Sequence, residues 1–119
     1  TMMRSGSQKR TVLRDLITGE CERIDFGDSG VQRFADGLEY SMVANDIFRI
    51  HESNPLSASI RCERTIRLER GDWQTRIEAR SELTSDESTF TVTSELDAYE
   101  GAVRVASKRW VHRTKRDFV

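Results

Sequence analysis

The chain has 119 residues, of which 36% are hydrophobic and 33% are charged, a length that predicts a single domain. Its 19 Lys and Arg residues nearly balance 20 Asp and Glu residues, and the net charge of −1 gives no overall field that would attract nucleic acid or an anionic membrane. No apolar run approaches the roughly 20 residues that a membrane-spanning helix needs, so we expect no membrane partner. At this size, folding is expected to hide about two-thirds of the unfolded surface around one modest core.

Residues 1–8 are small, polar and aperiodic, so we expect a disordered tail followed by a single β domain over 9–119. After the tail, apolar residues recur with a period of two, which is typical of strands. The first half predicts strands at 10–15, 22–26, 31–35 and 38–50, separated by turn residues at 18–19, 27–30 and 36–37. A helical turn over 39–43 is the alternative for the start of the fourth segment.

The clearest alternation lies in the segments 58–69 and 73–83, which flank the turn residues Gly71-Asp72. A hairpin closed at this turn pairs Ile66 with Ile77, Ile60 with Leu83 and Leu68 with Thr75 on its inner face. On its outer face the same hairpin pairs Glu63 with Arg80, Arg61 with Glu82 and Arg67 with Arg76. A slip of one residue would turn every apolar side chain outward, so the pattern sets which face is inner.

A second hairpin is predicted around Glu100-Gly101, after turn residues at 85–88. It places Ala98 beside Val103, Leu96 beside Val105 and Asp97 beside Arg104. With these hairpins the chain has about eight short strands, tight turns and no strong helix. We therefore predict an all-β, antiparallel meander that forms a barrel or a sandwich, because either arrangement shelters the unpaired edge strands.

Two short motifs are interpreted as turns rather than as functional signatures. Residues 27–30 spell Gly-Asp-Ser-Gly, as around a protease nucleophile, but no histidine precedes Ser29 to act as its base. Arg70-Gly71-Asp72 is the integrin-recognition tripeptide, and hairpin turn chemistry already explains its glycine and aspartate.

The histidines and cysteines are too sparse to predict a metal site, and we expect no cofactor. His51 and His112 are far apart in the sequence and are expected to be solvated. Cys21 and Cys62 do not make a disulfide framework, which favours free thiols in a reducing, cytoplasmic compartment. No set of residues supplies a nucleophile, a base and an orienting group together, so we expect no catalytic site within this chain.

Polar residues at inward positions of the predicted strands are candidate cavity-lining residues: Arg64, Ser94 and Arg109. In a closed barrel, Arg64 or Arg109 could meet the carboxylate of a ligand. The alternative is that these side chains lie near strand ends or at the rim of a sheet.

Three aromatic residues are candidate interface anchors, because aromatic side chains dominate interface cores: Trp73, Tyr99 and Trp110. Tyr99 lies on the outward side of its predicted strand and Trp110 opposes the inward set, so both are expected to be exposed. The alternative is that Trp73 and Tyr99 cap the ends of the core.

The segment 108–116 is rich in Lys and Arg around Trp110. Basic residues with an interleaved aromatic can bind single-stranded nucleic acid. We favour instead a terminal strand made polar to resist edge pairing, and expect no nucleic-acid partner.

Several short segments carry a family resemblance: Asn54-Pro55-Leu56-Ser57-Ala58, Arg70-Gly71-Asp72-Trp73, Leu83-Thr84-Ser85-Asp86, Leu96-Asp97-Ala98-Tyr99-Glu100-Gly101 and Arg116-Asp117-Phe118-Val119. They resemble the C-terminal region of large CocE/NonD-type hydrolases, the relatives of X-Pro dipeptidyl-peptidase and cocaine esterase. The likeness spans residues 10–119 and is specific from residue 54 onward. Lys115 departs from the pattern, since similar chains often carry a proline before the terminal Arg-Asp.

The resemblance implies that the parent protein is a serine hydrolase of esters or amides, whose Ser-Asp-His triad lies upstream and matches no residue here. This chain would be a non-catalytic C-terminal accessory domain that covers or shapes the active-site entrance or mediates subunit contacts. Its partner would be the α/β-hydrolase domain of the parent chain, with a homo-oligomer as a further alternative. A free-standing small-molecule-binding β-barrel is the rival hypothesis.

Overall fold

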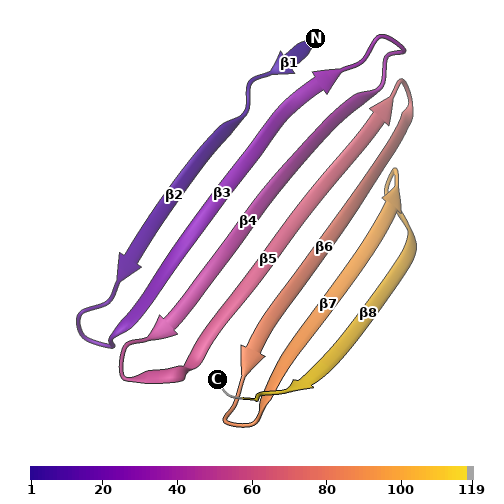
Figure 1. The fold of residues 1–119 in the computed structure, drawn as a ribbon. Helices are drawn as coiled ribbons and strands as arrows, with labels where there is room; N and C mark the ends of the chain where they lie inside the picture. The colour runs from indigo at the N-terminus through magenta and orange to yellow at the C-terminus, as the bar shows by residue number, and fades with distance from the viewer. Residues whose placement is uncertain (118–119) are drawn as a thin grey trace.

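The computed structural model describes residues 1–117, which form one open, antiparallel sheet of eight strands (Figure 1). The strands are β1 (Met2–Arg4), β2 (Ser7–Arg14), β3 (Glu20–Arg33), β4 (Glu39–His51), β5 (Asn54–Arg70), β6 (Trp73–Ser85), β7 (Thr89–Glu100) and β8 (Val103–Lys115). From β3 to β8 each strand pairs with the next, and β1 and β2 both pair with β3. The predicted all-β antiparallel meander is therefore confirmed.

The prediction of a closed barrel is wrong. β1 and β2 form one edge of the sheet, and β8 forms the opposite edge and pairs only with β7 (Figure 1). All eight strands belong to this one sheet, so the described residues contain no second sheet that would complete a sandwich. Residues 1–8, assigned above to a tail, hold β1 and the first two residues of β2. Phe118 and Val119, which end the predicted domain and the last motif of the resemblance, lie outside the described residues.

The hairpin of β5 and β6 has the predicted register throughout. Ile66 lies opposite Ile77 and Glu63 opposite Arg80, and the pairing of Arg70 with Trp73 closes the turn. Gly71 has a φ of 58° there, a left-handed conformation that glycine adopts without strain. The segment 39–51 is strand β4, so the alternative of a helical turn at its start is wrong.

The predicted register of the β7–β8 hairpin is wrong. Glu100 pairs with Val103, so the turn consists of Gly101 and Ala102 and not of Glu100-Gly101. An irregularity then shifts the pairing, and Ala98 lies opposite Ala106. Because side chains alternate between the two faces, an extra residue in β8 places every side chain beyond that point on the face opposite to the predicted one. The sequence carries no glycine or proline that would have marked this bulge.

Residues 27–30 do not form the predicted turn but a bulge within the continuous strand β3. Asp28 pairs with Val43 and Val31 with Ser41, so β3 contains one extra residue there. Ser29 Oγ accepts a hydrogen bond from the Met42 amide at 2.8 Å. The extra residue is therefore held by a side chain where the ladder of backbone hydrogen bonds is interrupted.

The expected core is absent among the described residues, since no hydrophobic side chain is buried. The accessible surface is 8579 Å², whereas a compact monomer of this mass exposes about 6,600 Å². The radius of gyration is 18.1 Å, against about 13.5 Å for a compact domain of this length. A single sheet has no second layer, so its side chains have nothing to pack against except their neighbours on the same face.

Strand alternation nevertheless sorts the side chains onto two different faces. We call one the apolar face; its members include Tyr40, Met42, Phe48, Ile60, Ile66, Leu68, Ile77, Leu83, Val92 and Leu96. We call the other the charged face; its members include Glu22, Arg49, Arg61, Glu63, Arg67, Glu78, Arg80, Glu82, Glu95 and Asp97.

The bulge in β3 gives a test of the fold. Gly30 has a φ of 74°, and a Cβ atom there would collide with the main-chain oxygen of Arg4. Gly27, in the same strand, has open space where its Cβ would lie. We expect Gly30→Ala to lower the free energy of unfolding by more than about 1 kcal/mol, measured by urea denaturation.

Gly27→Ala is the matched control and should change that free energy by less than about 0.5 kcal/mol. Equal effects of the two substitutions would contradict the bulge geometry.

Candidate functional site

One row of side chains crosses the whole apolar face and interrupts it with polar groups. The strand pairings place these residues directly opposite one another from β2 to β8: Arg10, Asp25, Asp46, Cys62, Ser81, Ser94 and Trp110. We call this row the central rung. Apolar side chains lie on either side of it, with Met42, Ile66 and Ile77 toward one end of the strands and Phe48, Ile60 and Leu83 toward the other.

Two carboxylates lie side by side in the central rung, and each is bound by an arginine. The Arg23 guanidinium binds both oxygens of Asp25, at 3.0 and 2.8 Å. Arg10 Nε lies 3.1 Å from Asp25 Oδ1. The hydrogen bond from Arg23 lowers the pKa of Asp25, although the neighbouring Asp46 carboxylate opposes that shift. The pair therefore stays ionised because each carboxylate has its own cation.

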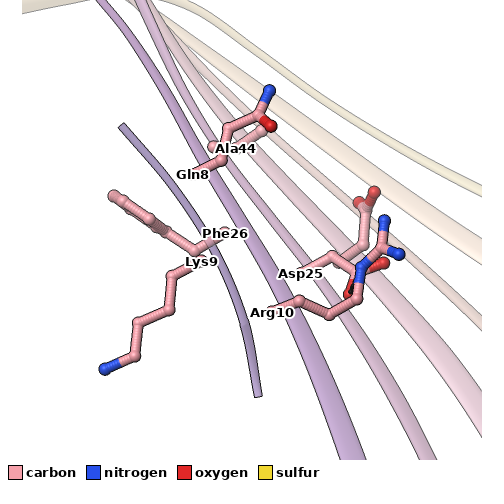
Figure 2. A pocket seen from close by; sticks show the side chains of 8 residues that line it. Gln8, Lys9, Arg10, Asp25, Phe26 and Ala44 are labelled. Atoms are coloured by element: carbon pink, nitrogen blue, oxygen red, sulfur yellow. Dashed lines mark ion pairs between the residues drawn. The ribbon is translucent and has the colours of Figure 1, made fainter. Parts of the chain in front are cut away.

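A hollow of about 620 Å³ lies over this part of the sheet, where Gly27 has no side chain to fill it. Figure 2 shows Arg10 and Asp25 leaving the sheet on one side, whereas Lys9 and Phe26 leave it on the other. The hollow is thus lined by the Arg10–Asp25 ion pair and Asp46 together with the small residues Gly27 and Ala44.

Arg64 binds the second carboxylate and so connects β4 with β5. Its Nη1 donates to Asp46 Oδ1 at 2.8 Å, and its Nη2 lies 3.3 Å from Oδ2. This pairing lowers the pKa of Asp46. Partial burial raises the pKa of the Cys62 thiol, and a hydrogen bond with Asp46 raises it further. Cys62 is therefore a protonated donor to the carboxylate at neutral pH and not a reactive thiolate.

The other end of the central rung is neutral. The Ser81 and Ser94 hydroxyl oxygens lie 2.8 Å apart and share a hydrogen bond between β6 and β7. Trp110 follows on β8 and is 50% exposed. Most polar groups of the rung are thus paired within the sheet, so a layer covering the apolar face would leave few of them without a partner.

The structure places only two of the three predicted cavity-lining residues on the same face of the sheet. Arg64 and Ser94 lie on the apolar face, Arg64 beside the central rung and Ser94 within it. Arg109 lies on the charged face, where its Nε is 3.4 Å from Glu95 Oε1. Its predicted inward position is wrong because the bulge in β8 exchanges the two sides of the strand. Since the sheet is open, no barrel interior encloses any of them.

The three candidate interface aromatics also divide between the faces. Trp73 and Trp110 belong to the apolar face and are 44% and 50% exposed. Tyr99 lies on the charged face, where the Arg76 guanidinium stacks 4.2 Å from its ring centroid. The same bulge makes the predicted orientation of Trp110 wrong, since Trp110 lies with the inward set and not against it.

Ion pairs between neighbouring strands cover the charged face. Arg80 Nη2 donates to Glu95 at 3.0 Å and to Asp97 at 3.1 Å. Hydrogen bonding from Arg80 lowers the pKa of Glu95. The pKa of Asp97 is lowered first by a hydrogen bond from Ser107 and then by Arg80. These contacts are solvated cross-strand pairs, which stabilise a sheet modestly.

The remaining candidates for chemistry do not form a reactive cluster in the part of the chain that the structure describes. His51 Nδ1 lies 2.8 Å from Ser53 Oγ, but this pair lies at the β4–β5 turn and no acid is hydrogen-bonded to the ring. Residues 1–117 contain no group of three or more His, Cys, Asp or Glu side chains that could hold a metal ion. Cys21 and Cys62 are free thiols, as predicted. No helix among the described residues is long and apolar enough to cross a membrane.

Comparison with known proteins gives no match: no family model, no curated protein and no solved structure is significantly similar to the chain. The resemblance to CocE/NonD-type hydrolases therefore stays a prediction.

Sequence reasoning identified Ser94 and Arg64 as inward polar residues but missed the central rung as a unit. The missing members are the carboxylates of Asp25 and Asp46, which lie on the strands with the weakest alternation. The signal for such a row is a polar residue among the inward apolar residues of each strand. In two paired strands, the two polar residues lie equally far from the turn that joins the strands. For β2 to β4 the sequence does not give that distance, because residues 27–30 have the composition of a turn.

The paired carboxylates predict how stability depends on pH. Asp25, Asp46, Glu95 and Asp97 all have lowered pKa values in the folded chain. The unfolded state then binds more protons than the folded state, so stability is fully present above the ordinary carboxyl pKa of about 4 and falls as pH drops below it. We expect the melting temperature, followed by circular dichroism, to be level near neutrality and to fall below about pH 4.

Arg64→Gln should reduce that acid-dependent fall, because Asp46 would lose the cation that lowers its pKa. A melting temperature that rises on acidification would contradict the assignment.

The contact between Cys62 and Asp46 predicts thiol reactivity. Asp46→Asn removes the carboxylate that raises the pKa of Cys62 and leaves Arg64, which lowers it. In a Cys21→Ser background, we expect this substitution to speed alkylation by iodoacetamide at about pH 8, close to the ordinary thiol pKa.

Asp25→Asn is the control, since Asp25 has no contact with the thiol and should leave the rate unchanged. An unchanged rate in Asp46→Asn would show that Asp46 does not act on Cys62.

Proposed function

We propose that this chain is a non-catalytic accessory domain of a CocE/NonD-type serine hydrolase and that its apolar face packs against the α/β-hydrolase domain of the parent protein. The observation that carries this proposal is an eight-stranded sheet whose described residues bury no hydrophobic side chain. Apolar surface left in water is unfavourable, so a sheet with one apolar face calls for a second layer.

The amount of uncovered surface supports a docked state. The chain exposes about 2,000 Å² more than a compact monomer of its mass. Strands of 13 residues are about 43 Å long, and seven neighbouring strands are about 29 Å wide. The apolar face therefore offers roughly 1,200 Å², above the roughly 800 Å² that each partner contributes to an interface of standard size.

The polar groups of the apolar face also favour burial. Asp46 is neutralised by Arg64, and Ser81 and Ser94 bond to each other. Such pairs can enter an interface with less desolvation cost than free polar groups would. Trp73 and Trp110 add large, partly exposed aromatic surfaces on the same face, which is typical of interface anchors.

The rival of a small-molecule-binding barrel has no supporting observation, because the sheet is open and Arg109 lies on the opposite face from Arg64 and Ser94. An accessory domain needs no catalytic residues of its own. This role is consistent with residues 1–117, in which no nucleophile, base and orienting acid come together.

The proposal is tested first by the reading frame that encodes the chain and then by docking. We expect the frame to continue upstream into a Gly-x-Ser-x-Gly elbow of an α/β-hydrolase domain. With that domain expressed separately, Ile66→Asp should weaken binding to it at least about tenfold in isothermal calorimetry, because a charge would enter the centre of the interface.

Thr65→Asp is the matched control, since Thr65 is the preceding residue of β5 and lies on the charged face. It should leave binding within about twofold. A stop codon directly upstream would contradict membership of a hydrolase, and equal effects of the two substitutions would contradict docking through the apolar face.

A further inference from the structure

We propose that the free edge of β8 binds an extended acidic peptide segment, which would add a ninth strand to the sheet. This edge is separate from the apolar face, so the inference does not depend on the proposed function.

The first argument is the unpaired backbone. β8 has 13 residues and contains no proline, and among residues 1–117 it pairs on one side only, with β7. Every residue of β8 is exposed. Beyond the bulge, from Ala106 to Lys115, its outward N–H and C=O groups form an uninterrupted template that an extended peptide can complete with main-chain hydrogen bonds.

The second argument is charge. β8 contains five Lys and Arg residues and no Asp or Glu. Neither Lys108 nor Arg113 forms an ion pair within residues 1–117, and strand alternation places them on opposite faces of the sheet. An incoming strand would therefore meet unneutralised cations on both of its sides.

The third argument is that β8 already pairs with one acidic strand, β7, within the fold. β7, which pairs with the inner side of β8, has three acidic residues and no basic one. Its Glu95 and Asp97 contact Arg109 at 3.4 Å and Arg104 at 3.8 Å. An acidic strand on the outer side would repeat this arrangement with the cations that β7 leaves unpaired.

The same charges select against other occupants. At the opposite edge, β2 has three basic residues and no acidic one, so pairing an edge strand with a second copy of the chain brings like charges together. Single-stranded nucleic acid would match the charge but cannot continue a strand ladder. Trp110 and Arg113 also lie on opposite faces of β8, so they do not form one stacking surface.

The experiment uses the full chain and a fluorescein-labelled peptide of repeating Thr-Thr-Glu-Glu, as long as β8, so that glutamates lie on both faces of the added strand. Binding is followed by fluorescence anisotropy. We expect the acidic peptide to bind at least about tenfold more tightly than the same peptide with lysine in place of glutamate. Lys108→Glu combined with Arg113→Glu should weaken acidic-peptide binding by at least about tenfold. Arg67→Glu in the central strand β5 is the matched control and should leave it within about twofold.

Two further peptides separate strand addition from simple charge attraction. Each is methylated on every second backbone nitrogen, in one phase or the other, so that one edge of the peptide loses its donors while the charge is kept. We expect one phase to lose binding by at least about tenfold and the other to retain it. Equal binding in both phases, or equal binding of a single-stranded DNA of the same charge, would overturn the proposal. Circular dichroism of each variant verifies that the sheet is intact.

Discussion

Main-chain hydrogen bonding between neighbouring strands is the interaction on which this molecule depends. Seven antiparallel pairings hold the sheet, and no buried hydrophobic cluster supports them among residues 1–117. Each such bond adds only about 1 kcal/mol net, since the unfolded chain bonds to water instead. Every strand between the two edges is therefore paired on both sides, whereas the side chains pack only against neighbours on the same face of the sheet.

This imbalance gives the two faces different physical roles. Much of the charged face is already paired, because residues such as Arg80, Glu95 and Asp97 meet across strands in contact with water. The apolar face is not satisfied, because Ile66, Ile77 and their neighbours have no opposing layer. The central rung adds a third feature: most of its polar groups are bonded within the sheet, as Ser81 is to Ser94 and Asp46 to Arg64, and so do not require water. The apolar face is therefore better suited to being covered by a packed layer than to staying exposed to water.

The edges of the sheet differ from both faces, since they offer backbone groups instead of side chains. The charged residues of β2 and β8 are all basic, and the repulsion of like charges keeps copies of the chain from pairing edge to edge. It leaves an acidic strand free to approach, as β7 already does from inside. Covering a face and extending an edge are compatible, because a layer over the apolar face does not use the hydrogen-bonding groups of β8.

The sequence alone determined most of the strands and the β5–β6 hairpin. Alternation and the Gly71-Asp72 turn specified the β5–β6 register down to the opposition of Arg67 and Arg76, because a short turn fixes which residues face each other. It also indicated an antiparallel meander. Only the tertiary structure decided the bulges at Ser29 and in β8, since an extra residue depends on both strands and has no marker of its own in β8. The bulge in β8 places Arg109 and Trp110 on the faces opposite to those predicted. Only the tertiary structure also decided that the sheet is open. The sequence shows that one face is apolar. Whether the sheet curls to cover that face or leaves it for another layer depends on the summed twist of all eight strands.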